Sequence, residues 1–134
     1  MTDANLYTKF ANRFPQDAEN TRFAELEDGR FYLYSDIDKV TARMAATLSG
    51  LGVMPGDRVA AQVEKSMEAF MLYLAVVRAG AVFLPLNTAY TPAEIAYFLG
   101  DAEPRVFFCD LGKAEGLAPV AAKAAARLAT LGAW

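Results

Sequence analysis

The sequence predicts an α/β fold with a mostly parallel sheet that carries helices on both faces. Three stretches predict it: the short apolar run Val59 to Val63, the longer run Met67 to Val77, and a second short apolar run closed by Pro85. Ten of the eleven residues from Met67 to Val77 are hydrophobic, and a helix that is apolar all round is buried on every side. It is too short for a bilayer, which needs about 20 residues. Strand, buried crossover helix and strand make one βαβ unit.

The first 34 residues are predicted to add a helix and a hairpin. Residues 1–21 form a helical segment in which Leu6, Phe10 and Phe14 recur every four positions, and Pro15 ends it. Residues 22–34 form an antiparallel hairpin, because an Asp-Gly pair between two aromatic-rich runs is typical of one. Its strands are Arg22 to Leu26 and Phe31 to Tyr34, and its turn holds Asp28 and Gly29.

Residues 35–134 are predicted to hold one more helix and then βα units, in the order βαβαβα after residue 57. The first helix runs from Asp36 to about Gly50, and Ser35 with Asp38 resembles a capping box at its start. Thr91, Pro92 and Glu94 open another helix with an N-cap, a first-turn proline and a capping glutamate. The remaining strands are Arg58 to Val63, Ala81 to Leu84 and Val106 to Cys109, and the helix opened by Thr91 ends near Gly100. A last Ala-rich helix runs from Ala114 to Leu131 and stops at Gly132. Its expected buried residues are Leu117, Val120, Leu128 and Leu131.

Length and composition fit a single domain over residues 1–134. Counting Gly and leaving out Tyr changes the 54% hydrophobic content to about 56%, above the usual 45–50%. Two interpretations stay open. The chain is an Ala-rich α/β domain with buried parallel strands, or part of its apolar surface is an interface with the remainder of a larger protein.

Charge and residue usage exclude several function classes. The net charge is −3 without a basic cluster, which argues against a nucleic-acid partner. The single cysteine, Cys109, excludes a disulfide framework and suits a reducing cytoplasm. The absence of His removes the commonest general base and metal ligand. Residues 1–15 lack the apolar core of a signal peptide, and no membrane partner is expected.

Ligands of open α/β sheets usually bind beyond the carboxyl ends of the strands. These ends carry no dinucleotide or P-loop glycine motif. Asn87 and Tyr90, in the loop after the second strand of the βαβ unit, are the strongest substrate-binding candidates, because functional residues concentrate in such loops. No catalytic, cofactor or metal residue is predicted. The other polar candidates have simpler structural explanations: a solvated turn for Glu64 and Lys65, a helix first turn for Asp36 and Asp38, and a small core residue for Cys109.

Two runs resemble motifs near the N-terminus of the adenylate-forming acyl-CoA synthetase superfamily. One is Val77 to Asn87, VRAGAVFLPLN, which Thr91 to Ile95 continues. The other is Leu33 to Ile37, LYSDI, where the family usually has Thr or Ser, Tyr, any residue, Glu and Leu. Because Leu33 cannot cap a helix with its side chain, the cap is expected to move to Ser35. Within the superfamily the chain is most similar to malonyl-CoA synthetases, in residues 4–6, 56–66, 85–91 and 101–104.

This resemblance implies that the chain is the N-terminal portion of an enzyme that activates malonate with ATP and Mg²⁺ as an acyl-adenylate and transfers it to CoA. The family's phosphate loop, adenosine-binding Asp and catalytic Lys all lie later in such enzymes. No catalytic residue is therefore carried over, and the 134 residues alone are expected to be inactive. The resemblance implies the remainder of the enzyme as partner, and self-association or dye binding through apolar surface in its absence.

Two other functions stay open at this point. The parent could be another adenylate-forming enzyme, such as a medium- or long-chain acyl-CoA ligase or an adenylation domain that loads a carrier protein. From a different class, the chain could be a self-contained, non-enzymatic α/β binding module. A mostly polar surface and a ligand of its own would distinguish that module.

Overall fold

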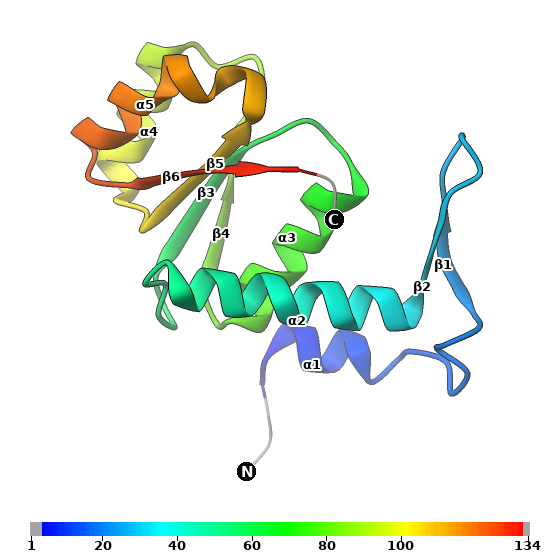
Figure 1. The fold of residues 1–134 in the computed structure, drawn as a ribbon. Helices are drawn as coiled ribbons and strands as arrows, with labels where there is room; N and C mark the ends of the chain where they lie inside the picture. Colours follow the sequence, from blue (N-terminus) through cyan, green and yellow to red (C-terminus); the bar gives the residue numbers. More distant parts are fainter. Residues whose placement is uncertain (1–3, 133–134) are drawn as a thin grey trace.

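The computed structural model describes residues 4–132 and contains two separate sheets (Figure 1). The first is an antiparallel hairpin, and the second has four parallel strands in the order β4-β3-β5-β6. The chain therefore has the predicted α/β class. The elements are α1 (Leu6–Ala11), β1 (Arg22–Glu25), β2 (Phe31–Leu33), α2 (Tyr34–Gly50), β3 (Arg58–Gln62), α3 (Met67–Arg78), β4 (Val82–Pro85), α4 (Pro92–Ala102), β5 (Val106–Asp110), the 3₁₀ turn η1 (Leu111–Lys113), α5 (Ala114–Lys123) and β6 (Arg127–Leu131).

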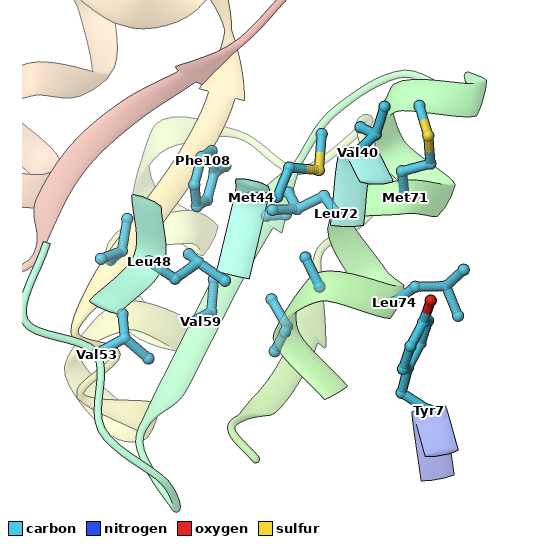
Figure 2. Packing of buried hydrophobic residues seen from close by; sticks show 14 of the residues in the cluster. Tyr7, Val40, Met44, Leu48, Val53, Val59, Met71, Leu72, Leu74 and Phe108 are labelled. Atoms are coloured by element: carbon cyan, nitrogen blue, oxygen red, sulfur yellow. The ribbon is translucent and has the colours of Figure 1, made fainter. Parts of the chain in front are cut away.

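Helices cover both faces of the parallel sheet, with α2 and α3 on one face and α4 and α5 on the other (Figure 1). Successive side chains of a strand point to opposite faces, and β5 shows this clearly. Val106 and Phe108 pack with α2 and α3, whereas Phe107 and Cys109 pack with α4 and α5. The sheet therefore separates two apolar clusters, the first of which is shown in Figure 2.

The apolar helix α3 is the centre of the first cluster, as predicted. Ser66 caps it by accepting a hydrogen bond from the backbone N–H of Ala69 at 3.0 Å. None of its residues is exposed, and Met71 and Ala75 are completely buried. Leu72 points from α3 toward Met44 of α2 (Figure 2). Burial on all sides explains why the run carries almost no polar residue.

The predicted capping of α2 through Ser35 is wrong. The helix begins earlier than predicted, at Tyr34, with Leu33 in the N-cap position. Asp36 Oδ2 accepts a hydrogen bond from the Leu33 backbone N–H at 2.8 Å, which is the half of a capping box that needs no polar cap side chain. The Ser35 N–H instead donates to the Ala18 carbonyl oxygen. The predicted box between Ser35 and Asp38 is also absent, because Asp38 binds Tyr7 of α1 and Arg78 of α3.

The first helix differs from the predicted stripe. It ends at Ala11 rather than at Pro15, and Tyr7 is its buried residue, whereas Leu6 is 55% exposed. Asn5 explains the shift: its Oδ1 caps the Tyr7 N–H at 2.8 Å and its Nδ2 donates to the Val77 carbonyl at 2.9 Å. These bonds fix α1 against the end of α3 with Tyr7 facing inward.

The largest correction concerns the C-terminal segment, where one helix was predicted from Ala114 to Leu131. The helix α5 ends at Lys123, Ala125 adopts a positive φ of 57°, and β6 follows as a fourth parallel strand beside β5. The order after residue 57 is thus βαβαβαβ. Alanine-rich sequence favours helix locally, but β6 gains the ladder to β5, and Ala126, just before it, is buried. Leu117 is buried as predicted, whereas Val120, Leu128 and Leu131 are only half-buried.

The other predicted elements are confirmed, with small differences at their ends. The hairpin, β3, β4 and β5 lie where the patterns placed them. Helix α4 begins after Thr91 with the predicted capping box, in which Thr91 Oγ1 and Glu94 Oε1 each accept the other residue's backbone N–H at 3.3 Å. It continues past Gly100, to Ala102. Within residues 4–132, no helix is both long and apolar enough to span a membrane.

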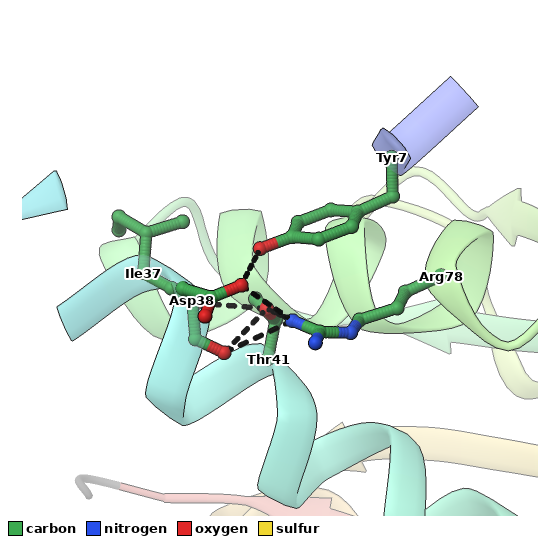
Figure 3. Close-up of polar contacts among 5 residues, drawn as sticks. All are labelled: Tyr7, Ile37, Asp38, Thr41 and Arg78. Carbon is green, nitrogen blue, oxygen red and sulfur yellow. Dashed lines mark hydrogen bonds and ion pairs between the residues drawn. The ribbon is translucent and has the colours of Figure 1, made fainter. Parts of the chain in front are cut away.

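A polar cluster joins the three helices of the first face (Figure 3). The Tyr7 hydroxyl donates to Asp38 Oδ1 at 2.8 Å, and Arg78 Nη1 donates to the same Oδ1 and to the Asp38 carbonyl, both at 3.0 Å. Arg78 Nη1 also donates to Thr41 Oγ1 at 3.2 Å. The guanidinium carbon lies 4.5 Å from the centre of the Tyr7 ring, a cation–π distance. Tyr7 of α1 is thereby attached to both α2 and α3.

Replacing Tyr7 by Phe tests this attachment. The ring and its stacking on Arg78 are retained, but the hydroxyl that donates to Asp38 is lost. We expect the free energy of unfolding at pH 7 to fall by about 1.5–3 kcal/mol, the usual range for one hydrogen bond to a charged group. Urea unfolding followed by circular dichroism measures it. An unchanged midpoint would mean that the hydroxyl contributes nothing to docking α1.

The same variant makes a prediction about pH. Burial is the main cause that raises the pKa of Tyr7 above its ordinary value. A raised pKa in the folded chain means that this phenol supports folding below its unfolded pKa of about 10 and opposes it as pH rises further. The difference in stability between wild type and the Phe variant should therefore shrink above pH 10.

Candidate functional site

The sheet topology brings the carboxyl ends of β3 and β5 together. From β3 the chain crosses through α3 to β4, and from β4 it returns through α4, on the opposite face, to β5 on the other side of β3. The chain thus leaves the neighbouring strands β3 and β5 in opposite directions. In open α/β sheets the crevice outside the carboxyl ends at such a point is the usual ligand position. This edge is the candidate functional site of the chain.

Asp110 holds the loops after β3 and β5 together. Its Oδ2 accepts a hydrogen bond from the Glu64 backbone N–H at 3.1 Å, across 46 positions of sequence. The side chains of Glu64, Lys65 and Ser66 are exposed beside it. Glu64 and Lys65 occupy the turn into α3, in agreement with the structural interpretation of these residues. The loop they form is fixed by Asp110, which sequence reasoning did not single out.

Gln62, the last residue of β3, holds the loop that carries Asn87 and Tyr90. Its side chain is 1% exposed, and its Nε2 donates to the carbonyl oxygens of Asn87 at 2.9 Å and Tyr90 at 3.2 Å. Two carbonyl acceptors fix the amide with nitrogen toward the loop and Oε1 away from it. Gln62 Oε1 is buried and has no hydrogen-bond partner among the described residues. The structure thus connects both predicted candidates through one buried amide.

The two predicted candidates differ in what their side chains do. Asn87 Oδ1 accepts a hydrogen bond from the Ala89 backbone N–H at 2.9 Å, so this side chain shapes its own turn. The Tyr90 ring stacks on Phe98 of α4, with ring centres 5.0 Å apart, and lines a cavity of about 290 Å³ at the carboxyl edge. Gln62, Pro92, Ile95, Gly112, Lys113, Gly116 and Leu117 line the rest of this cavity. Of the two, Tyr90 lines this cavity and Asn87 does not.

Sequence reasoning missed Gln62 because it lies inside an apolar run. The signal was present, since a single amide at the last position of a buried parallel strand has no water to bind and must find partners from the loops beyond. Asp110 likewise ends an apolar run, that of β5, although it is only half-buried. Both residues connect loops of the carboxyl edge, and neither needs a motif to be recognised.

The remaining predicted candidates have structural roles. Cys109 is completely buried, and burial, followed by the nearby Asp110 charge, raises the pKa of its thiol, so it favours the unreactive protonated form. Asp36 caps α2 and Asp38 binds Arg78. Within residues 4–132, no group of three or more acidic or Cys side chains is arranged to hold a metal ion. None of these three residues lines the cavity at the carboxyl edge.

Comparisons with known proteins identify the family of this fold. The profile of the AMP-binding enzyme family matches residues 7–132. The chain is 44% identical to the solved structure of ATP-bound MatB from Rhodopseudomonas palustris, with a TM-score of 0.90 over 96% of this chain and 25% of that one. The apo form of the same protein gives a TM-score of 0.89.

Two curated relatives are also similar to this chain over much of its length. Oxalate–CoA ligase from Arabidopsis thaliana is 35% identical over 129 residues, which cover 95% of this chain and 23% of the ligase. A fatty acid–[acyl-carrier-protein] ligase, ScoC from Streptomyces coeruleorubidus, is 30% identical over 97 residues, or 72% of this chain and 19% of that protein. The chain thus spans about a quarter of the length of relatives that it matches almost from end to end. With its four-stranded parallel sheet and separate hairpin, it belongs to the AMP-binding enzyme family, the adenylate-forming acyl-CoA synthetases.

Proposed function

We propose that this chain is the N-terminal portion of an ATP-dependent acid–thiol ligase that converts malonate, ATP and CoA to malonyl-CoA, AMP and pyrophosphate through an acyl-adenylate. The observation that carries the proposal is the 44% identity to MatB over 96% of the chain, because MatB is a malonyl-CoA synthetase. Oxalate, named in the Arabidopsis relative, is also a short dicarboxylate. The chemistry suits a cytoplasmic enzyme, as does the buried free Cys109.

The catalytic parts of such an enzyme are proposed to lie outside this chain. The family's phosphate loop, adenosine-binding Asp and catalytic Lys lie later in such enzymes, so no catalytic, nucleotide-binding or metal-binding role is proposed for the 134 residues. Their proposed contribution is a scaffold. Gln62 and Asp110 hold the loops of the carboxyl edge in fixed positions, where the rest of the enzyme can approach them.

The test is an activity assay on two proteins. One is the present chain, and the other is the same chain joined at Gly132 to the remainder of MatB from Rhodopseudomonas palustris. With ATP, Mg²⁺ and CoA, we expect malonate-dependent pyrophosphate release and malonyl-CoA, detected by mass spectrometry, from the joined protein alone. Acyl-adenylate formation by the 134-residue chain would contradict the scaffold role, and so would an inactive but folded joined protein.

The substrate preference is measured on the natural protein that contains this chain. Where that protein is longer than the chain, malonate, oxalate and a medium-chain fatty acid are compared as acids. Free CoA is compared with a carrier protein as acceptor. Preference for malonate and free CoA supports the proposal. Preference for a fatty acid and a carrier protein would favour the function of ScoC, the second candidate, which has a lower identity to this chain than MatB has.

A further inference from the structure

The fold brings together positive side chains that lie far apart in the sequence. At the amino edge of the parallel sheet, Arg58 is the first residue of β3 and Arg105 directly precedes β5. The Arg105 backbone N–H donates to the Arg58 carbonyl oxygen at 2.8 Å, one position before the register pair Val59 and Val106. Because the two arginines belong to different βα units, the sequence by itself shows no basic cluster here.

Both arginines point to the face of the sheet that α4 and α5 cover. Ala60 and Phe107 lie two positions further along β3 and β5 and pack on this face, and side chains two positions apart in a strand share a face. In agreement, Arg58 Nη1 donates to the Ala102 carbonyl oxygen at the end of α4, at 2.9 Å. Two like charges on neighbouring strands repel each other, and an anion beside them would offset this repulsion.

A cavity of about 480 Å³ lies beside Arg105 at this edge. It is bounded by the C-terminal ends of α4 and α5 and by the residues that lead into β3, β5 and β6. Its volume is within the roughly 300–1,000 Å³ of small-molecule sites. Four of its lining residues are charged, namely Asp57, Glu103, Arg105 and Lys123. It shares no lining residue with the cavity at the carboxyl edge, so the two are separate places in the fold.

The positive groups of this cavity have unused hydrogen-bond donors. Arg105 Nε donates to Asp57 Oδ2 at 3.4 Å, a long contact, and the same oxygen accepts the Met54 backbone N–H at 2.8 Å. Within residues 4–132, the terminal amino groups of Arg105 donate no hydrogen bond and Lys123 forms no ion pair. A guanidinium with two free amino groups matches the geometry of a carboxylate or a phosphate.

The negative groups near the cavity are mostly engaged. The C-terminal end of a helix repels anions through its unpaired carbonyl oxygens. Here the Ala102 carbonyl of α4 accepts Arg58 Nη1, and the Ala121 and Ala122 carbonyls of α5 accept backbone N–H groups of the following turn. Glu103 is exposed and forms no ion pair within the described part of the chain. Its carboxylate is therefore the group that opposes an anion most directly.

We propose that this cavity binds a compact oxyanion, a small dicarboxylate or a phosphate, between the guanidinium of Arg105 and the ammonium group of Lys123. Together with Arg58 beside Arg105, three cations face the carboxylates of Asp57 and Glu103. The site thus keeps a positive charge in a chain whose net charge is −3. It lies at the edge opposite the candidate functional site, and its ligand is bound independently of the proposed malonate activity.

A titration of the isotope-labelled 134-residue chain, followed by the NMR signals of its backbone amides, tests the proposal. Malonate and pyrophosphate are added separately, and the tighter of the two identifies the source of the oxyanion. Sodium chloride at matched ionic strength controls for screening. We expect saturable shifts at residues 103–105 and 123–125 and none in the loop 87–90 of the carboxyl edge. Shifts that chloride reproduces, shifts confined to the carboxyl edge, or no shifts with either anion would overturn the proposal.

Substitutions of the two cations locate the binding. Arg105→Gln should weaken it roughly tenfold, the scale of one lost charge-assisted hydrogen bond, and Lys123→Gln about threefold, because its ammonium group sits on a flexible stem. Arg43→Gln and Lys39→Gln are the matched controls, since both residues are exposed on α2 and neither lines the cavity. We expect each control to change the affinity less than about twofold. Equal weakening in all four variants would mean that the overall charge attracts the anion, and would overturn the proposal.

Glu103→Gln gives a change of the opposite sign, which a folding defect cannot produce. It removes the exposed carboxylate at the cavity and keeps the size of the side chain. We expect the affinity for the oxyanion to rise about twofold to threefold, because the repulsion between like charges is lost. Unchanged or weaker binding by this variant would place the anion away from Glu103 and overturn the assignment of the cavity.

Discussion

Replacing Phe107 by Ala is expected to lower the free energy of unfolding by about 3–5 kcal/mol, the range for truncating a buried phenylalanine. Phe107 is completely buried at the centre of β5, in the cluster beneath α4 and α5. Its neighbours in register are Ala60 of β3 and Leu128 of β6. Ala60 is too short to fill the space that the ring would leave, so most of the cavity should persist. Such a loss is a large fraction of the roughly 5–15 kcal/mol that stabilises a typical domain.

The matched control is Val82→Ala at the start of the edge strand β4. Val82 is 51% exposed, and its truncation should cost no more than about 0.5–1 kcal/mol. Urea unfolding followed by circular dichroism measures both variants. Similar midpoints for the two would show that the cluster between the sheet and α4 and α5 is loosely packed, in conflict with the complete burial of Leu99 and Phe107.

The sequence predicted much of the fold because several elements depend on local signals. The run Met67 to Val77 has too few polar residues to face water anywhere. The Asp-Gly turn and the Thr91 capping box each depend on residues that lie within about four positions of one another in the sequence. The largest exception is β6, since Arg127 to Leu131 follows an alanine-rich helix without an intervening Gly or Pro. It becomes a strand because the edge of β5 is available to pair with it, and pairing across the sheet is not a local property.

The candidate site was less accessible to sequence reasoning. Asn87 and Tyr90 could be selected because the carboxyl edge of such a sheet is a general position for ligands. The choice between them could not be made, since it depends on which side chain turns back to its own loop and which lines the cavity. Gln62 and Asp110 act across 25 and 46 positions of sequence, respectively. Contacts of this kind appear only when the strand order is known.

Replacing Gln62 by Glu is expected to destabilise the chain severely at neutral pH. The substitution keeps the shape but puts a carboxylate oxygen where Nε2 now donates to the carbonyls of Asn87 and Tyr90. Burial of an ionised carboxylate beside two carbonyl oxygens strongly raises its pKa, and each tenfold weakening of the acid corresponds to about 1.4 kcal/mol. If folding weakens this acid by roughly a hundredfold to a thousandfold, the charge costs about 3–4 kcal/mol at pH 7.5, in addition to the lost hydrogen bonds.

The control is Gln62→Met, which removes the same two hydrogen bonds without adding charge. It also removes the Oε1 atom that lacks a partner, so part of the cost of losing the bonds is offset. We expect it to lower the free energy of unfolding by about 1–3 kcal/mol, the range for leaving buried carbonyls unsatisfied. The difference between the Glu and Met variants then isolates the effect of the charge.

The pH dependence distinguishes a buried charge from a general packing defect. In the Glu variant the folded pKa lies above the unfolded value of about 4.3, so the folded chain retains a proton that the unfolded chain releases. Its stability should fall as pH rises from about 5 to 8, and should level off only above the folded pKa. The stability difference between the Met and Glu variants should therefore widen with pH. Parallel curves would show that the side chain at position 62 reaches water, which would remove the buried amide as the link between β3 and the loop of Asn87 and Tyr90.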